Sequence, residues 1–217
     1  MNIEQARFNM IEQQIRPWDV LDPAVLELLG AVRREDFLPA AHKALAFVDT
    51  EVPLAEGQVM LAPRVEARLL QEAKVQRHET VLEIGTGSGF MAALLGHRAL
   101  RVITLEKRAA LARQAREALQ RAGLANVEVR EADGREGLAA EGPFDVIVLS
   151  GSVAQVPQVL LDQLKPGGRL VAVEGNEPVM RAVLITRTAE AAFAKVELFD
   201  TITPRLDGFA EPSRFHF

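Results

Sequence analysis

The chain has 217 residues, a net charge of -5 and 48% hydrophobic residues, and its mean hydropathy of +0.06 is typical of a globular protein in water. It contains no cysteine, which excludes disulfides, thiolate nucleophiles, iron–sulfur clusters and cysteine-ligated zinc. The acidic balance provides no electrostatic attraction to a phosphate backbone or an anionic membrane, so we expect neither nucleic acid nor a membrane as a partner.

The start of the chain predicts helices. Apolar residues recur at helical spacing from Ile3 to about Ile15, and Pro17 then interrupts the pattern. Asp22–Pro23 provides a cap and a first turn for a second helix, which we expect to end at Phe37–Pro39. The sequence therefore predicts an N-terminal helical extension.

An irregular stretch separates these helices from a third one. Residues 40–63 contain turn-forming residues and no sustained period, which predicts a surface segment of the kind that often shapes active sites. Pro63 begins the third predicted helix, which extends to Ala73. We expect residues 1–78 to form a helical and substrate-loop region and residues 79–217 to form a cofactor-binding domain, the two making one compact unit.

From residue 79 onward, short apolar runs alternate with amphipathic stretches, a pattern typical of βαβ units. The predicted strands are Thr80–Ile84, Arg101–Leu105, Val127–Arg130, Asp145–Leu149 and Arg169–Val173. The predicted helices are Gly89–Leu95, Ala109–Ala122, capped by Gly123, and Val156–Leu164. Two further strands, Met180–Arg187 and Ala194–Phe199, predict an antiparallel edge. The predicted fold class is α/β: a Rossmann-like, doubly wound, mostly parallel sheet with helices on both faces, antiparallel C-terminal strands and an N-terminal helical extension.

The first predicted strand runs directly into a glycine-rich loop. The loop reads Glu83-Ile84-Gly85-Thr86-Gly87-Ser88-Gly89, and its glycines permit turns and a close ligand approach that a Cβ would prevent. The third glycine comes one position too early for a dinucleotide fingerprint, and Phe90 stands where that fingerprint needs a small residue. A GxxxxGK[ST] phosphate loop is also missing from the sequence. Nicotinamide chemistry and nucleotide hydrolysis are therefore disfavoured.

The same E-x-G-x-G-x-G run resembles the first motif of class I methyltransferases, whose loop accommodates the amino-acid end of S-adenosylmethionine. The resemblance implies S-adenosylmethionine as the cofactor, with Glu83 orienting the loop and the cofactor's amino end. A glycine loop that merely turns the chain is the alternative for this motif taken alone. The loop residues implied as cofactor contacts are Gly85, Thr86, Gly87, Ser88 and Gly89.

Later motifs follow in the order of the same superfamily. About 20 residues after the loop a strand ends at Glu106, where a carboxylate can accept hydrogen bonds from both ribose hydroxyls, and the alternative is an acid that caps the next helix. Asp133-Gly134 stands where the superfamily places an acid beside the adenine amino group, and the alternative is a plain turn aspartate. Phe144–Ser150 resembles the fourth strand, with Ser150 as a further cofactor contact, and Leu164–Leu170 resembles the turn into the fifth.

Over nearly its whole length the chain resembles the protein-L-isoaspartate O-methyltransferase family. The resemblance is carried by Arg33–Pro39, Val48–Gln58, Leu82–Phe90 and Phe199–Leu206. It implies an enzyme that esterifies an abnormal aspartyl carboxylate in damaged protein, which starts the return of that residue to normal aspartate.

The predicted substrate loop departs from the family at one residue. The family reads roughly "t-I-S-x-P", with the serine hydroxyl beside the carboxylate to be methylated, whereas this chain reads Val59–Pro63 and has Leu61 in the serine's place. Leucine cannot donate a hydrogen bond, so an anionic acceptor loses a contact commonly worth about 1.5–3 kcal/mol. Gln58, Ser150 and Ser152 are alternative polar contacts or plain loop residues. The sequence does not identify a catalytic acid or base; methyl transfer to a carboxylate needs mainly proximity and in-line approach, because that oxygen is already nucleophilic.

Three functions remain open on these observations. The first is an isoaspartyl-type methyltransferase acting on a protein or peptide carboxylate. The second is a methyltransferase on the same scaffold with a different acceptor, such as a small molecule, in a pocket made more apolar by Met60 and Leu61. The third is a cofactor-binding module without catalysis.

The sequence predicts no metal site, and it specifies no oligomeric state. The histidines lack the paired spacing of a metal-binding helix; they are His42, His78, His97 and His216. The N-terminus lacks the basic start and apolar core of an export signal, so we expect a cytoplasmic location.

Overall fold

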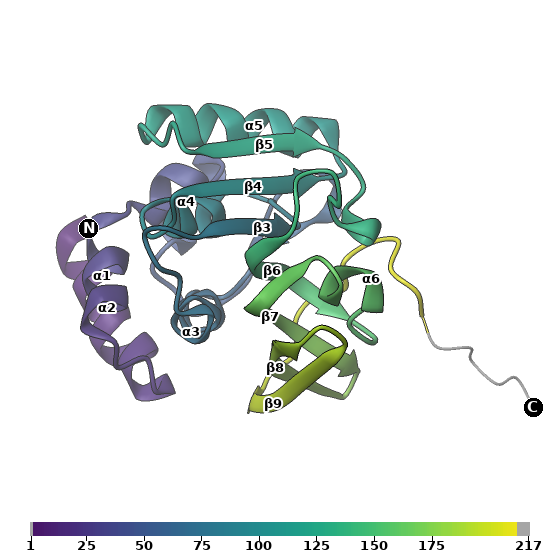
Figure 1. Ribbon diagram of the computed structural model, residues 1–217. Helices are drawn as coiled ribbons and strands as arrows, with labels where there is room; N and C mark the ends of the chain where they lie inside the picture. The colour runs from purple at the N-terminus through teal and green to yellow at the C-terminus, as the bar shows by residue number, and fades with distance from the viewer. Residues whose placement is uncertain (1, 212–217) are drawn as a thin grey trace, which may run out of the picture.

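Short runs of valine, leucine and isoleucine form the central sheet, whose strand order is β5-β4-β3-β6-β7-β8-β9. The computed structural model describes residues 2–211. The strands from β5 to β7 are parallel, while β8 and β9 are antiparallel. Figure 1 shows β5 and β9 at opposite edges. The bounds are β3 Thr80–Ile84, β4 Arg101–Glu106, β5 Val127–Glu131, β6 Phe144–Val153, β7 Leu164–Asn176, β8 Val179–Ala189 and β9 Ala192–Asp200.

Helices precede the sheet and alternate with its strands, so the predicted fold class is confirmed. The α-helices are α1 Ile3–Met10, α2 Pro23–Ala31, α3 Pro63–Ala73, α4 Phe90–Gly96, α5 Ala109–Arg121 and α6 Gln158–Leu161. Asp22 caps α2 as predicted, because its side chain accepts a hydrogen bond from the Ala24 amide. Gly123 has a φ of +73° after α5, in agreement with a left-handed C-terminal cap.

The N-terminal elements differ from the prediction in detail. The first helix continues past α1 as a π-helical turn, Ile11–Ile15, and a 3-10 turn, Arg16–Trp18. The prediction that the second helix reaches Phe37–Pro39 is wrong, because α2 ends at Ala31 and a separate 3-10 turn follows at Arg34–Phe37. That separate turn carries the buried Arg34 side chain, which makes its contacts with Leu61 and Glu66 in the interior.

The segment predicted to be irregular contains some regular structure. It includes a 3-10 turn, Ala40–Leu45, and a two-residue antiparallel pair formed by β1, Val52–Pro53, and β2, Val59–Met60. The predicted helix at residues 156–164 is too long, because α6 spans only Gln158–Leu161. Leu164 already pairs with Phe144 as the start of β7, which leaves no room for another helical turn.

Side chains alternate across the sheet and supply two cores. One face, with Val81, Val148 and Val171, belongs to the main core cluster together with residues of α1 to α5. The other face, with Leu82 and Ile147, packs against α6 and the C-terminal Phe209. The main cluster contains residues that come before position 78 in the sequence and residues that come after it. The N-terminal helices and the sheet therefore share one core.

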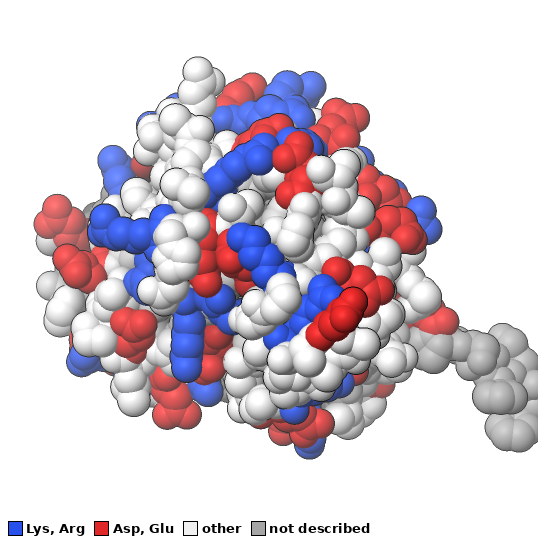
Figure 2. Space-filling view, in the orientation of Figure 1, with Lys and Arg blue, Asp and Glu red and all other residues white. Residues whose placement is uncertain are grey.

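Charged side chains of both signs are interspersed over the face drawn in Figure 2. Many of them form ion pairs, such as Arg101 with Glu128 and with Glu141, at 2.9 and 3.0 Å. No helix within residues 2–211 is long and apolar enough to cross a membrane.

Candidate functional site

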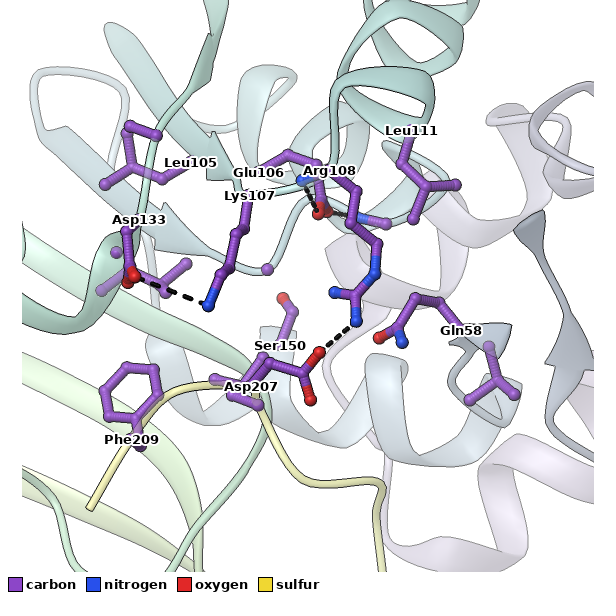
Figure 3. A pocket seen from close by; sticks show the side chains of 17 residues that line it. Gln58, Leu105, Glu106, Lys107, Arg108, Leu111, Asp133, Ser150, Asp207 and Phe209 are labelled. Carbon is purple, nitrogen blue, oxygen red and sulfur yellow. Dashed lines mark hydrogen bonds and ion pairs between the residues drawn. The ribbon is translucent and has the colours of Figure 1, made fainter. Parts of the chain in front are cut away.

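The candidate site is a cavity at the carboxyl ends of the parallel strands, where β3 and β6 lie side by side in the middle of the sheet. The chain leaves β3 toward β4 on one side and leaves β6 toward β7 on the other, so this is the switch point at which α/β sheets bind ligands. Figure 3 shows the cavity. The lining residues are Gln58, Val59, Ile84, Gly85, Gly87, Leu105, Glu106, Lys107, Arg108, Leu111, Ala132, Asp133, Gly134, Ser150, Leu206, Asp207 and Phe209.

The glycine loop forms one wall of this cavity. Gly85 has a φ of +93°, which favours glycine, and a Cβ there would lie 2.7 Å from the Leu206 side chain, which would have to move. Ser88 and Gly89 are not among the lining residues. The Ser88 hydroxyl accepts a hydrogen bond from the Phe90 amide, and Gly89 lies against Ala115 of α5. The loop thus presents Gly85 and Gly87 to the cavity and uses its last residues to begin α4.

Glu83 lies beneath the loop and is fully buried. Its two carboxyl oxygens accept hydrogen bonds from the hydroxyls of Ser150 (2.6 Å) and Thr104 (2.7 Å). Thr104 also contacts the Thr86 hydroxyl at 2.6 Å. Burial raises the pKa of Glu83 to about 8, although the two hydroxyls act in the opposite direction. Glu83 therefore connects the loop to β6 through Ser150, which itself lines the cavity.

Glu106 lies at the end of β4 and is 5% exposed. One carboxylate oxygen accepts a hydrogen bond from the Gly87 amide at 2.9 Å, and the other accepts one from the Arg108 amide at 3.0 Å. The second contact is the helix-capping interaction considered from the sequence, because Arg108 is the N-cap of α5. The carboxylate lines the cavity at the same time, so it can also accept hydrogen bonds from a ligand.

Asp133 and Gly134 follow β5 and lie on the neighbouring wall. The Asp133 side chain accepts hydrogen bonds from the amide and the Nε of Arg135, and it lies 3.6 Å from the Lys107 ammonium. Burial raises the pKa of Asp133, but these hydrogen bonds and the Lys107 charge lower it overall. At Gly134 a Cβ would lie 2.4 Å from the Ile84 side chain, which excludes any larger residue without rearrangement.

The C-terminal segment contributes to the lining of the cavity. Leu206, Asp207 and Phe209 line it, and Asp207 forms an ion pair with Arg108, as Figure 3 shows. The backbone amide of Leu206 donates to the Ser152 carbonyl at 2.9 Å, which holds the segment against the end of β6. Sequence reasoning missed Lys107, Arg108, Asp207 and Phe209. The only sequence signal for these residues is their position: Lys107 and Arg108 follow Glu106, and Asp207 and Phe209 follow the Phe199–Leu206 motif.

The predicted substrate loop lies in the interior. Leu61 is 5% exposed and belongs to the main core cluster. Its carbonyl accepts a hydrogen bond from Arg34 at 2.6 Å, and the Arg34 guanidinium pairs with Glu66 and stacks on the Phe90 ring at 5.1 Å. Arg34 thus connects the loop at Leu61 to the start of α4.

Six of the ten predicted cofactor residues line the cavity; they are Gly85, Gly87, Glu106, Asp133, Gly134 and Ser150. Glu83 and Thr86 do not line the cavity and belong to the hydrogen-bond network that includes the hydroxyls of Ser150 and Thr104. Ser88 and Gly89 lie at the start of α4. Within residues 2–211 no group of three or more histidine, aspartate or glutamate side chains is arranged to hold a metal ion. His216 lies outside the described residues.

The chain is similar to protein-L-isoaspartate O-methyltransferases. Residues 5–201 match the family model described as protein-L-isoaspartate(D-aspartate) O-methyltransferase. A protein-L-isoaspartate O-methyltransferase of Rhodopseudomonas palustris is 40% identical over 207 residues, which cover 94% of this chain and 95% of the relative. The one from Koribacter versatilis is 38% identical over 194 residues, covering 89% and 87%.

Solved structures agree with the fold. A Plasmodium falciparum protein assigned as a protein-L-isoaspartate O-methyltransferase, crystallised with S-adenosyl-L-homocysteine, superposes with a TM-score of 0.76. The superposition covers 95% of this chain and 99% of the other, at 21% sequence identity. At that identity the likeness establishes the fold.

Proposed function

This chain belongs to the protein-L-isoaspartate(D-aspartate) O-methyltransferase family, and from that premise we propose that it transfers a methyl group from S-adenosylmethionine to the carboxylate of an isoaspartyl residue in a protein or peptide. The observation that carries the proposal is the convergence of the glycine loop, Glu106 and Asp133 on one cavity at the switch point of the sheet.

The residues of the cavity fit S-adenosylmethionine. Glu106 and Asp133 both line the cavity, and in this proposal Glu106 accepts hydrogen bonds from the ribose hydroxyls and Asp133 accepts one from the adenine amino group. Apolar side chains from three elements, Ile84, Leu105 and Leu111, offer apolar contacts to the flat surface of an adenine. Gly85 and Gly87 leave room for the amino-acid end, because neither carries a side chain and both have a positive φ, +93° and +51°, that other residues rarely adopt.

When bound, S-adenosylmethionine supplies an electrophilic methyl group on a positively charged sulfur. The protein's own contribution is to hold an acceptor carboxylate beside that position and to exclude water. Leu206 and Phe209 cover the cavity, and Asp207 is held in place by Arg108, so the C-terminal segment shields the site from solvent. No general base is required, because the acceptor oxygen already carries the attacking electron pair.

The proposal is tested with S-adenosylmethionine labelled in its methyl group. The purified protein is incubated with an isoaspartyl peptide and, separately, with the same peptide containing normal aspartate, and base-labile label is counted. Label on the isoaspartyl peptide alone is expected. Equal label on both peptides, or none while S-adenosylhomocysteine still binds, contradicts the proposal.

A second candidate is a methyltransferase on the same scaffold with a different acceptor, and Leu61 is the observation that favours it. The serine hydroxyl of the family pattern is replaced by a side chain buried in the core. Under this alternative, label from the cofactor appears on small-molecule acceptors and not on isoaspartyl peptides.

A further inference from the structure

Two segments outside the main sheet contribute to the wall of the cofactor cavity. The turn segment, residues 54–59, contains the turn between β1 and β2 and contributes Gln58 and Val59. The strap segment, residues 206–209, lies beyond the end of β9. All other lining residues belong to the main sheet, to α5 or to the loops that follow the strands of that sheet. The wall thus has a part built on the sheet and a part built from two separate segments.

The Arg108 side chain joins the turn segment to the strap segment. Its Nη2 forms an ion pair with the Asp207 carboxylate of the strap segment, and its Nε lies 3.8 Å from the Glu56 carboxylate of the turn segment. Figure 3 shows the Arg108 guanidinium extended toward Asp207. Within residues 2–211 neither carboxylate has another ion-pair partner. In the described part of the chain, Arg108 therefore provides the charged link between the two segments.

These three charged groups lie where the cavity meets solvent, and we call them the rim cluster. Arg108 and Asp207 both line the cavity, yet their side chains are 20% and 48% exposed. Glu56 is 47% exposed and stands two residues before the lining residue Gln58. The rim cluster is therefore at the boundary between the cavity and the water outside.

The helix that begins at Arg108 does not favour an arginine there. Arg108 is the N-cap of α5, a position that favours side chains able to accept a hydrogen bond, and the helix dipole opposes a positive charge at this end. The Arg108 amide donates instead to the Glu106 carboxylate at 3.0 Å, which fixes the backbone from which the side chain extends. The two carboxylate partners, Glu56 and Asp207, explain why an arginine suits this position.

The cavity is small for the cofactor that its residues fit. Its volume is about 70 Å³, whereas pockets for small molecules and cofactors are commonly about 300–1,000 Å³. Part of the wall must therefore move when the cofactor enters or leaves. The strands β3, β4 and β6 pair with neighbours on both sides, but Glu56, Gly57, Asp207 and Gly208 are exposed. The turn and strap segments can therefore move with the least loss of packing.

We propose that Arg108 is a latch on the cofactor cavity. It holds the turn segment and the strap segment together at the rim, and S-adenosylmethionine and S-adenosylhomocysteine pass when its two ion pairs break. The proposal rests on the proposed function, which assigns the cofactor to this cavity, and it adds the step that controls cofactor exchange. Because Arg108 acts through Glu56 and Asp207, it is a positioning residue.

The test measures how fast S-adenosylhomocysteine enters and leaves the full-length protein, by surface plasmon resonance on immobilised protein. Arg108→Met removes both ion pairs and keeps an aliphatic side chain. Arg108→Lys keeps a positive charge, but a compact ammonium lacks the fork of donors that reaches two carboxylates. The matched control is Arg113→Met, at an exposed arginine of the same helix. Thermal unfolding followed by circular dichroism shows that the variants are folded.

Arg108→Met is expected to raise both the association and the dissociation rate constants about three- to tenfold, with the Kd within about threefold of the wild type. Both rate constants rise because the rim opens more often in the free and in the bound protein. A residue that contributes only affinity would raise the dissociation rate constant alone. Arg108→Lys should give intermediate rate constants, and Arg113→Met should match the wild type.

The two ion pairs are also tested one at a time and with salt. Asp207→Asn and Glu56→Gln each remove one partner and are expected to raise both rate constants about twofold to threefold. Salt screens exposed charges, so exchange in the wild type should become faster between about 50 mM and about 0.5 M sodium chloride. Arg108→Met should respond little to the same change in salt.

The outcomes separate this inference from the proposed function. Equal rate constants in the wild type and Arg108→Met, or a change in dissociation alone, overturn the latch, and methylation of the isoaspartyl peptide then leaves the function standing. Faster exchange in Arg108→Met, in a protein that does not methylate the isoaspartyl peptide, leaves the latch standing and overturns the function. If S-adenosylhomocysteine does not bind at all, both are overturned.

Discussion

The cofactor cavity and the hollow lined by Trp18, Asp49, Arg64 and Thr203 differ in how their polar groups are paired. Glu83, Glu106 and Asp133 all have hydrogen-bond partners within the protein, whereas the Arg64 Nε and the Thr203 hydroxyl are buried without one. The polar groups of the cofactor cavity are thus held in position before a ligand arrives. Substitutions among them should therefore change stability or cofactor affinity.

The largest expected effect is at Arg34, which connects the loop at Leu61 to the start of α4. Arg34→Met leaves the Glu66 carboxylate buried without its partner, which is expected to lower the free energy of unfolding by about 3–5 kcal/mol. Urea unfolding followed by circular dichroism measures it. Arg33→Met, at an exposed neighbour, is the control and should change stability by about 0.5 kcal/mol or less. Adding Glu66→Leu to Arg34→Met should recover most of the loss, and a stable single variant would contradict the argument.

The next effect is a pH dependence that arises from Glu83. Its pKa is about 8 in the folded protein against 4.5 ordinarily, so between these values the folded state keeps a proton that the unfolded chain has released. The free energy of unfolding therefore falls as pH rises from about 4.5 to about 8. Glu83→Gln should make the decline in Tm over this range shallower, with Glu131→Gln as an exposed control. Burial also raises the pKa of Glu66, so some decline remains. Parallel Tm profiles for Glu83→Gln and the wild type would refute the assignment.

A smaller effect is expected at Glu106, confined to the cofactor. Glu106→Gln removes a charged acceptor from the cavity and should weaken S-adenosylhomocysteine binding about tenfold or more. Calorimetric titration measures this, again with Glu131→Gln as the control. An unaltered cofactor affinity would mean that Glu106 serves only the loop and the start of α5.

Local sequence patterns were sufficient to predict most strands of the sheet. Thr80–Ile84 was predicted with its observed bounds, because an apolar run bounded by turn residues is a complete signal for a strand. The end of α2 was not predicted, since Arg34 lies outside the helix and contacts Glu66 and Leu61, partners far along the chain. The length of α6 was also missed, because it depends on the pairing of Leu164 with Phe144.

The residues of the candidate site also divide into those that local sequence predicted and those that it did not. Gly85, Glu106 and Asp133 were predicted because each directly follows or ends a strand, and parallel strands bring those positions to one edge. Asp207 and Phe209 were not predicted as lining residues, because only the packing of the C-terminal segment against β6 brings them there. Ser88 and Gly89 were predicted as cofactor contacts, but the structure places them at the start of α4.

By itself the sequence determined the α/β fold class, the position of the glycine loop and the order of the acidic residues, since periodicity and strand-ending motifs are local properties. Only the tertiary structure decided that Leu61 points into the core and that Trp18, Asp49, Arg64 and Thr203 surround one hollow. These four residues come from four separate segments. Their proximity results from long-range packing, and no short stretch of sequence records it.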